Sequence, residues 1–345
     1  MGEKRFRNKV NWFVFFFSIL VIRVHSYNAE LFLGRTQEAA ALDRMERFLG
    51  ERIGQIAVPG FFMISGYLFY RNFTMDKLWK KWGSRIGSIL IPYLLWNGIY
   101  YIGYVVGSRL PFVGEIVGKG EVPFGLAQLT DAVLYHRYHY VFWYLYQLIM
   151  LVALAPVLYP LLKRKLLARA AFVLMLVGIG MNVSLPALNL DALFYYSAAV
   201  YLAIHEKRLV ERGWNLKRGL AGLCMICGGV FLEQGGLVML PFHALFSVLF
   251  RLLVPMGLWL LVPEGCLPQA KGWARNNFFI YAVHFAMVRL INKTVAALFS
   301  GIFAVPLILY LMMPVIITVI SYGLARLMER KMPSVWKILT GGRGM

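Results

Sequence analysis

Apolar stretches of nearly membrane-spanning length recur along the whole chain, and no soluble domain separates them. A helix needs about 20 predominantly apolar residues to cross a bilayer. The sequence therefore predicts an all-α fold, a polytopic membrane bundle of about ten transmembrane helices. The predicted spans are residues 11–27, 54–70, 86–106, 141–162, 168–184, 190–205, 219–234, 242–262, 276–296 and 303–325.

The composition supports the same class of protein. Hydrophobic residues make up 60% of the chain and charged residues 15%, whereas a soluble domain has about 25% charged residues. No small-residue cleavage site follows the first apolar segment, which therefore reads as a retained span rather than a signal peptide. We expect residues 1–345 to form a single multi-pass domain, with the lipid bilayer as its first partner.

The net charge of +20 would suit a nucleic-acid-binding protein, but its distribution favours another explanation. If the N-terminus is cytoplasmic, the inside segments hold 25 Lys and Arg residues and the outside segments hold 8. Cytoplasmic loops of membrane proteins collect basic residues in this way. The asymmetry predicts that both termini are cytoplasmic, and nucleic acid is not an expected partner.

Two of the predicted outside segments are long. Residues 28–53 carry mixed charge and predict a short amphipathic helix at the membrane interface. Residues 107–140 begin rich in Gly and Pro and end in an aromatic, basic stretch. No internal repeat of the kind that marks inverted-repeat transporters is visible.

Two histidines, His25 and His284, lie within predicted spans. Ionisable residues there are costly and are functional candidates by default. Tyr281 precedes His284 by one helical turn on the same face. The alternative for His284 is a core histidine bonded to a neighbouring helix. Arg23 lies about 200° around the helix from His25, so we expect it to face lipid headgroups or a different neighbour and to anchor the interface.

His136 and His139 form an H-x-x-H pattern, which could place two metal ligands on one helical face. No carboxylate or third histidine is spaced to complete such a site. The sequence therefore predicts no metal site.

Five segments carry a family resemblance when taken in order. They are VIRVHSYN with His25, VPGFFMISGYLFYR (58–71), RIGSILIPYLLW (85–96), HYVFWYLYQLIMLVALAPVL (139–158) with Pro156, and NNFFIYAVHF (276–285). Each alone is a weak pattern in apolar sequence. Together, on a ten-span map, they resemble the acyltransferase 3 family of bacterial integral membrane acyltransferases over nearly the whole chain.

The resemblance implies a function. Members of the family move acyl groups, commonly acetyl from acetyl-CoA, onto hydroxyls of cell-envelope glycans, lipids or other acceptors. The chain is thus expected to be an O-acetyltransferase-like enzyme of the bacterial plasma (inner) membrane. Acyl-CoA would be a donor substrate, with no permanently bound cofactor. The acceptor would be an envelope polysaccharide, a lipid-linked sugar or a small molecule.

The resemblance also gives the residues possible roles. A histidine that titrates near neutrality suits the task of taking a proton from a sugar hydroxyl, and His25 is the candidate base. The oxyanion needs a donor in a dry site, which His284, Tyr281, Ser65 or a buried arginine could supply. His139 and Trp143 belong to a family segment and are further candidates.

The donor's phosphates should meet basic residues near the cytoplasmic face. Arg71 and Arg85 lie beside family segments and are the candidates for binding CoA, although setting the topology would also explain them. Ser65 and Gly66 permit close helix packing, which is the simpler explanation of the FFMISG segment.

The chain departs from the family at one position. The family usually has a basic residue eleven positions before the first-span histidine, where this chain has Val14. Lys9 is the nearer basic residue and the candidate replacement. Two alternatives to an enzyme follow: a transporter or flippase of an envelope precursor that uses intramembrane His and Arg residues, or a non-catalytic relative.

Overall fold

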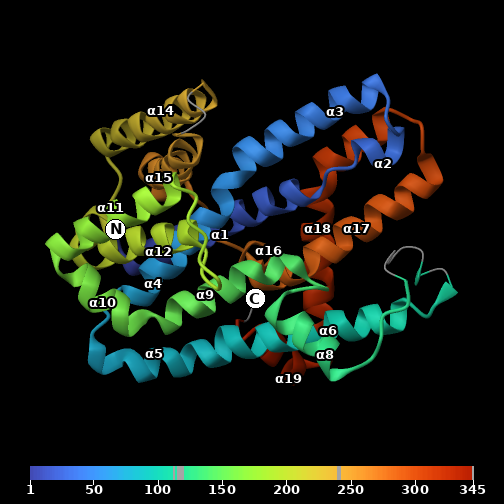
Figure 1. The fold of residues 1–345 in the computed structure, drawn as a ribbon, viewed down its shortest axis with the longest axis horizontal. Coiled ribbons are helices and arrows are strands. Elements are labelled where there is room, and N and C mark those ends of the chain that lie inside the picture. Colours follow the sequence, from blue (N-terminus) through green and yellow to red (C-terminus); the bar gives the residue numbers. More distant parts are fainter. Residues whose placement is uncertain (112, 115–119, 239–241, 344–345) are drawn as a thin grey trace. The chain divides into compact units, whose positions relative to one another are not determined.

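The computed structural model describes residues 1–111, 113–114, 120–238 and 242–343. Within these residues the secondary structure consists of helices joined by loops, with no strand (Figure 1). The predicted outside segments 107–140 and 233–242 and the end of the chain lie partly outside the described residues. The helices are α1 (Glu3–His25), α2 (Ala29–Leu33), α3 (Gln37–Arg47), α4 (Ala57–Tyr70), α5 (Leu78–Arg85), α6 (Ile91–Gly107), α8 (Leu126–Leu134), α9 (Trp143–Ala153), α10 (Ala155–Lys163), α11 (Lys165–Gly180), α12 (Leu190–His205), α13 (Lys207–Glu211), α14 (Leu216–Val238), α15 (His243–Leu261), α16 (Gly272–Arg275), α17 (Asn277–Phe299), α18 (Ala304–Lys331) and α19 (Pro333–Leu339).

A helix lies at each of the ten predicted positions, but fewer are long and apolar enough to cross a membrane. Among the described residues, 6 helical stretches qualify, and 7 do if the bent pair α9–α10 counts as one span. α11 and α12 have 16 residues each, short of the usual length for crossing. The chain is a multi-pass helical membrane protein. The count of ten and the cytoplasmic termini remain predictions.

The chain divides into two compact units. Unit 1 comprises Met1–Val21, Arg52–Trp82 and Met150–Arg275, and unit 2 comprises Ile22–Glu51, Gly83–Ile149 and Asn276–Met345. Each unit is assembled from three separated stretches of chain, so neither is a continuous sequence domain. The single domain over residues 1–345 stays a prediction.

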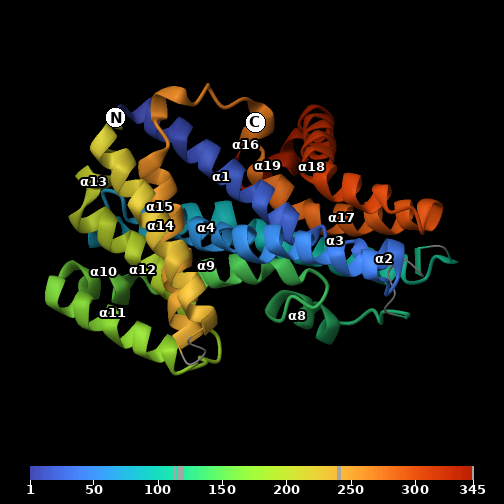
Figure 2. The ribbon, with the colours of Figure 1, turned by 90° about the horizontal axis from the view of Figure 1, so that it is seen from above.

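Glycines allow the closest helix contacts of unit 1. α14 and α15 lie side by side (Figures 1 and 2), and a Cβ atom added at Gly222 would lie 2.5 Å from the carbonyl oxygen of Gly257. α4 packs on α12 in the same way, because a Cβ atom at Gly66 would lie 2.9 Å from the carbonyl oxygen of Tyr196. The packing role predicted for the FFMISG segment is confirmed at Gly66.

Lys9 is fixed within unit 1 at the end of α15. Its ammonium group is buried and donates hydrogen bonds to the carbonyl oxygens of Trp259 (2.7 Å) and Val262 (2.6 Å). The last carbonyls of a helix lack intrahelical partners, and a lysine placed there satisfies them. Its role as the replacement for the basic residue missing at Val14 stays a prediction.

A tryptophan compensates for a proline in unit 1. Pro156 has no N–H to donate to the carbonyl of Val152, one turn earlier. The indole Nε1 of Trp82 donates to that carbonyl instead, at 2.9 Å. α9 and α10 are bent by 64° at this break, which is the kind of kink that proline causes.

In unit 2 an arginine compensates for a proline in the same way. Pro314 lies inside α18 and leaves the carbonyl of Tyr310 without its helical donor. The guanidinium of Arg23 donates to the carbonyl oxygens of Tyr310 (2.7 Å) and Leu311 (2.9 Å). Arg23 thus binds a neighbouring helix, and its role as an interface anchor stays a prediction.

The predicted amphipathic helix in residues 28–53 is α3. Thr36 caps its start by accepting a hydrogen bond from the backbone N–H of Ala39 at 3.0 Å. Ala39, Leu42 and Glu46 are buried along one face, at the three- and four-residue spacing of a helix. Its place at the membrane interface stays a prediction.

Candidate active site

Three segments of unit 2 bring two histidines and a tyrosine together. α1 ends at His25, α17 carries His284, and the turn before α9 supplies Tyr140. The imidazole rings of His25 and His284 are 5.4 Å apart between centroids, and Nδ1 of His25 lies 2.8 Å from the hydroxyl of Tyr140. Phe285 packs against both His25 and Tyr140. The two histidines predicted to be catalytic are therefore neighbours.

The two histidines differ in accessibility. His284 is 0% exposed, whereas His25 is partly exposed. A substrate can therefore touch His25 without rearrangement of the fold. His284 lies behind it and would act through His25 in this conformation.

The hydrogen bonds of His284 fix its tautomer. Nδ1 lies 2.8 Å from the carbonyl oxygen of Tyr281 and 3.2 Å from that of Ile280. A carbonyl oxygen can only accept, so Nδ1 carries the proton. In the neutral ring Nε2 is then a bare acceptor, and it has no hydrogen-bond partner among the described residues. A buried acceptor nitrogen normally has a hydrogen-bond donor, and this one lacks it.

His139, which also packs on α17, likewise has one hydrogen-bonded ring nitrogen and one without a partner among the described residues. Its Nε2 donates to the carbonyl oxygen of Ala282 at 3.1 Å, so its buried Nδ1 is the bare nitrogen and has no described partner. The ring stacks on Tyr100 with 3.8 Å between centroids, and the Tyr100 hydroxyl donates to the same Ala282 carbonyl at 2.8 Å. His139, His284 and His25 influence one another electrostatically.

The H-x-x-H pattern does not present its two rings to one point. His136 has a left-handed backbone conformation, with φ of 53°, and its Nε2 lies 2.8 Å from the hydroxyl of Tyr93. Burial lowers the pKa of His136 below its ordinary value. His139 instead binds α17, so the two histidines have separate partners.

Tyr281 holds the turn that carries Tyr140. Its hydroxyl donates to the carbonyl oxygen of Val141, and its ring stacks on Phe142 at 5.5 Å. Its one proton is therefore engaged by the backbone, which favours a positioning role over oxyanion binding. Trp143 is half-buried at the start of α9, next to this turn.

Ser65 lies in α4 of unit 1, whereas the histidine cluster belongs to unit 2. It is half-buried beside Gly66, which packs on α12. Its surroundings therefore support the packing explanation of the FFMISG segment, and its catalytic role stays a prediction.

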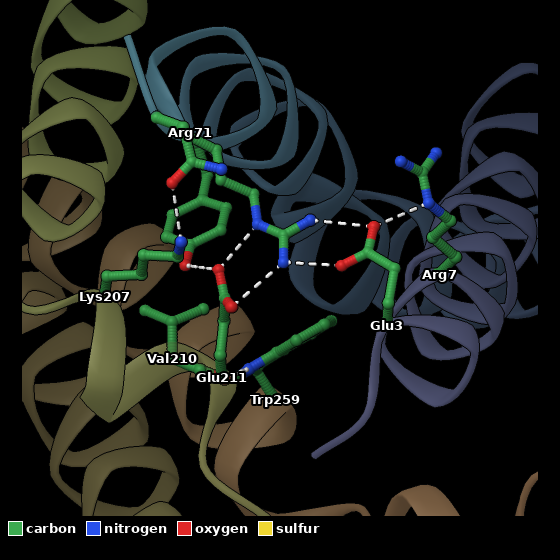
Figure 3. A network of polar contacts seen from close by, with 9 residues as sticks. Glu3, Arg7, Arg71, Lys207, Val210, Glu211 and Trp259 are labelled. Atoms are coloured by element: carbon green, nitrogen blue, oxygen red, sulfur yellow. Dashed lines mark hydrogen bonds and ion pairs between the residues drawn. The ribbon is translucent and has the colours of Figure 1, made fainter.

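Arg71 is held by two carboxylates in unit 1 (Figure 3). Its guanidinium forms paired bonds with Glu3 (3.0 and 2.7 Å) and with Glu211 (2.6 and 2.9 Å). The Tyr67 hydroxyl also donates to Glu211 at 2.7 Å. Burial would raise the pKa of Glu211, but the bonds from Arg71 and Tyr67 outweigh it and lower that pKa. The network ties α1, α4 and α13 together.

Arg85 has a second cation near it in unit 2. The C-terminal helix α19 is anchored by a hydrogen bond from Trp96 Nε1 to the carbonyl of Leu339 at 3.0 Å. This brings Arg343, whose guanidinium lies 4.6 Å from the ring centroid of Phe278, within electrostatic reach of Arg85. Burial and the neighbouring Arg85 lower the pKa of Arg343 to about 10. Two like charges held together favour an anion between them.

Tyr140, Tyr100 and Arg289 are the residues of this region that the sequence did not single out. Tyr140 stands in a run of aromatic residues where no spacing distinguishes it. Tyr100 comes from α6, far from the other members in sequence, whereas Arg289 follows His284 by five residues on α17. The one available signal was Arg289, a charged residue inside a predicted span.

Comparison with known proteins identifies the family. The sequence matches the family description "Acyltransferase domain" (Acyl_transf_3) over residues 8–326. The chain belongs to the acyltransferase 3 family. It is also 24% identical over 328 residues to the succinoglycan biosynthesis protein ExoH of Rhizobium meliloti (strain 1021), which covers 88% of this chain and 83% of the relative. No solved structure matches the chain.

Membership of the acyltransferase 3 family decides the broad function. The chain is a membrane acyltransferase, and its relative is named for the synthesis of a glycan. The resemblance on which the sequence interpretation rested is confirmed.

Proposed function

We propose that the protein transfers an acyl group, in the first instance acetyl, from acyl-CoA to a hydroxyl of a cell-envelope glycan or a related acceptor. It would do so as a multi-pass enzyme of the bacterial plasma membrane. The observation that carries the proposal is the pairing of the accessible His25 with Tyr140, beside the buried His284.

The chemistry follows from the two nitrogens of His25. When Nδ1–H donates to the Tyr140 oxygen, Nε2 is left bare and can accept a proton. The acceptor's hydroxyl proton moves to Nε2 as its oxygen attacks the thioester carbon. The C–S bond then breaks, and the CoA sulfur takes the proton from His25. The products are the ester and free CoA, and His25 is again neutral.

Two further features support this role of His25. The ring of His284 lies 5.4 Å from that of His25 and has a bare Nε2, which would stabilise a proton placed nearby. No carboxylate in the described part of the chain forms a salt bridge with either histidine. The imidazolium would therefore be short-lived, which suits a proton carrier between two substrates.

For the donor, the arrangement supports Arg85 more than Arg71. Arg71 already binds two carboxylates, so phosphates would have to displace both. Arg85 has Arg343 as a second cation within electrostatic reach, and the pair together would meet the charge of a polyanion. We place the phosphates of CoA at Arg85 and Arg343, because guanidinium groups bind phosphate with paired hydrogen bonds.

The test is acyl transfer by the purified full chain in detergent or nanodiscs, with labelled acetyl-CoA and envelope glycan. We expect labelled ester and free CoA from the wild type. His25→Ala should lose at least about 100-fold in rate, the usual size of an acid–base contribution. His243→Ala is the matched control, because His243 is exposed at the start of α15.

The alternatives give different results. Uptake of a precursor into vesicles, with no release of CoA, would show a transporter or flippase instead. Wild-type protein that neither releases CoA nor transports would point to a non-catalytic relative. Near-normal turnover by His25→Ala would remove His25 as the base.

A further inference from the structure

Arg289 carries its charge in the middle of a predicted membrane span. It lies about 18 Å from the start of α17 and about 15 Å from its end, at 1.5 Å per residue. An arginine at this depth costs about 2.5–3.5 kcal/mol on insertion scales, and its side chain cannot easily reach the interface. Arg23 differs, because it lies in the last turn of α1 and donates to two carbonyls.

The surroundings of Arg289 supply little compensation. Its guanidinium lies 5.7 Å from the ring centroid of Phe285, and Nη1 makes one long hydrogen bond, 3.5 Å, to the Tyr104 hydroxyl. No carboxylate among the described residues forms a salt bridge with Arg289. The described salt bridges of unit 2 join other arginines to their acids: Arg35–Glu30, Arg47–Asp43, Arg47–Glu51, Arg109–Glu121 and Arg137–Asp131.

The same arginine is close to the candidate active site. Phe285, one turn before Arg289, has its ring 5.5 Å from that of His25 and 4.8 Å from that of Tyr140. Arg289 is also the cation that acts electrostatically on the Tyr140 hydroxyl. The half-buried guanidinium of Arg289 therefore lies beside the ring that packs against His25 and Tyr140.

We propose that Arg289 binds a carboxylate of the acceptor, so that the preferred acceptor is an acidic sugar. The inference rests on the proposed acyl transfer. Guanidinium and carboxylate form two parallel hydrogen bonds, which gives both affinity and orientation. Arg289 lies further along α17 than His284, away from the helix start that the predicted topology puts in the cytoplasm. On that topology Arg289 would lie on the side opposite the proposed CoA site, from which an envelope acceptor would come.

The experiment compares two acceptors that differ at one carboxyl group, which is charged in one and methylated in the other. Purified wild-type protein is assayed with labelled acetyl-CoA and either 4-nitrophenyl β-D-glucuronide or the methyl ester of the same glucuronide. We expect a KM at least about tenfold lower for the acid than for the ester, because hydrogen bonds to charged groups are strong. Arg289→Gln should raise the KM for the acid to that of the ester. Arg289→Lys should retain part of the preference that Arg289→Gln loses, since lysine keeps the charge but cannot form the two parallel hydrogen bonds of a guanidinium.

The ratio of the two KM values is independent of how much protein is folded, because both acceptors are assayed with one preparation. Arg169→Gln, at an exposed position of α11, is the matched control and should keep the preference. Equal KM values in the wild type would overturn the inference and leave the acyl transfer standing. A loss of kcat in Arg289→Gln that is the same for acid and ester would also overturn it. If neither acceptor is acylated while an envelope glycan is, the carboxylate proposal is wrong; if nothing is acylated, the proposed function is wrong as well.

Discussion

The Nδ1 atom of His25 and the hydroxyl of Tyr140 are joined by a 2.8 Å hydrogen bond, which links the last residue of α1 to the turn before α9. The bond fixes the orientation of the ring and leaves Nε2 as its other nitrogen. If His25 is the proposed base, Tyr140 acts through it, as a positioning residue.

Tyr140→Phe should lower kcat by roughly tenfold to a hundredfold and change the KM for acetyl-CoA little, because it removes the bond but keeps the ring. The measurement is steady-state kinetics of the purified variant, with the pH dependence of kcat recorded. A displaced pH profile identifies the effect on His25. A lower yield of protein with unchanged kcat would show that Tyr140 serves folding alone.

His284→Ala should lose at least about tenfold in turnover if its bare Nε2 contributes to proton transfer. His284→Asn tests the atom itself, because an amide can still donate to the Tyr281 carbonyl but has no group at the Nε2 position. We expect both variants to be equally slow. Activity restored by Asn would mean that the bond to the helix backbone is all that His284 provides.

Gly66→Ala should destabilise unit 1 by about 1–3 kcal/mol, the usual cost of overpacking. The added Cβ would lie 2.9 Å from a backbone oxygen of α12, which cannot move aside as a flexible side chain could. The melting temperature in detergent is the measurement. Gly98→Ala on α6 is the matched control, since no atom lies within 4 Å of its added Cβ. Equal melting temperatures for the two variants would contradict the packing role.

The Glu3–Arg71–Glu211 network predicts a pH-dependent stability. The pKa of Glu211 is lowered in the folded protein. Its contribution is therefore present above the unfolded pKa of about 4.3 and is lost as the pH falls through the folded pKa. Glu211→Gln should melt about 2–4 °C below the wild type at neutral pH, the shift expected for about 1 kcal/mol. The difference in melting temperature between the variant and the wild type should disappear in acid. A difference that is constant with pH would exclude the ionised carboxylate as its cause.

The sequence predicted the helices and the two histidines because their signals are local. Apolar runs of spanning length and ionisable residues inside them are visible without the fold. Tyr140 was not predictable, because what distinguishes it from the aromatic residues around it is its contact with His25. The partners of Lys9 and Arg23 were not predictable for a similar reason: they are carbonyls of helices hundreds of residues away.

The number of spans was the weakest expectation for a physical reason. Apolar runs at 168–184 and 190–205 resemble spans, but the helices formed there have 16 residues each. Hydropathy reports where a chain avoids water, and crossing also requires a helix of sufficient length. Length alone does not explain the count, because α14 has 23 residues and is not among the helices that qualify. A run can satisfy the first condition and fail the second.

The bond from Arg23 to the carbonyl that Pro314 leaves unpaired has a consequence for how this family varies. The proline leaves a carbonyl without its hydrogen-bond donor, and the arginine supplies one, so each residue is tolerated because of the other. Relatives that have lost the proline should be free to lose the arginine, and the two positions should change together through evolution. A pair so distant in the chain would then record, in sequence alone, that the end of the first helix touches the last long one.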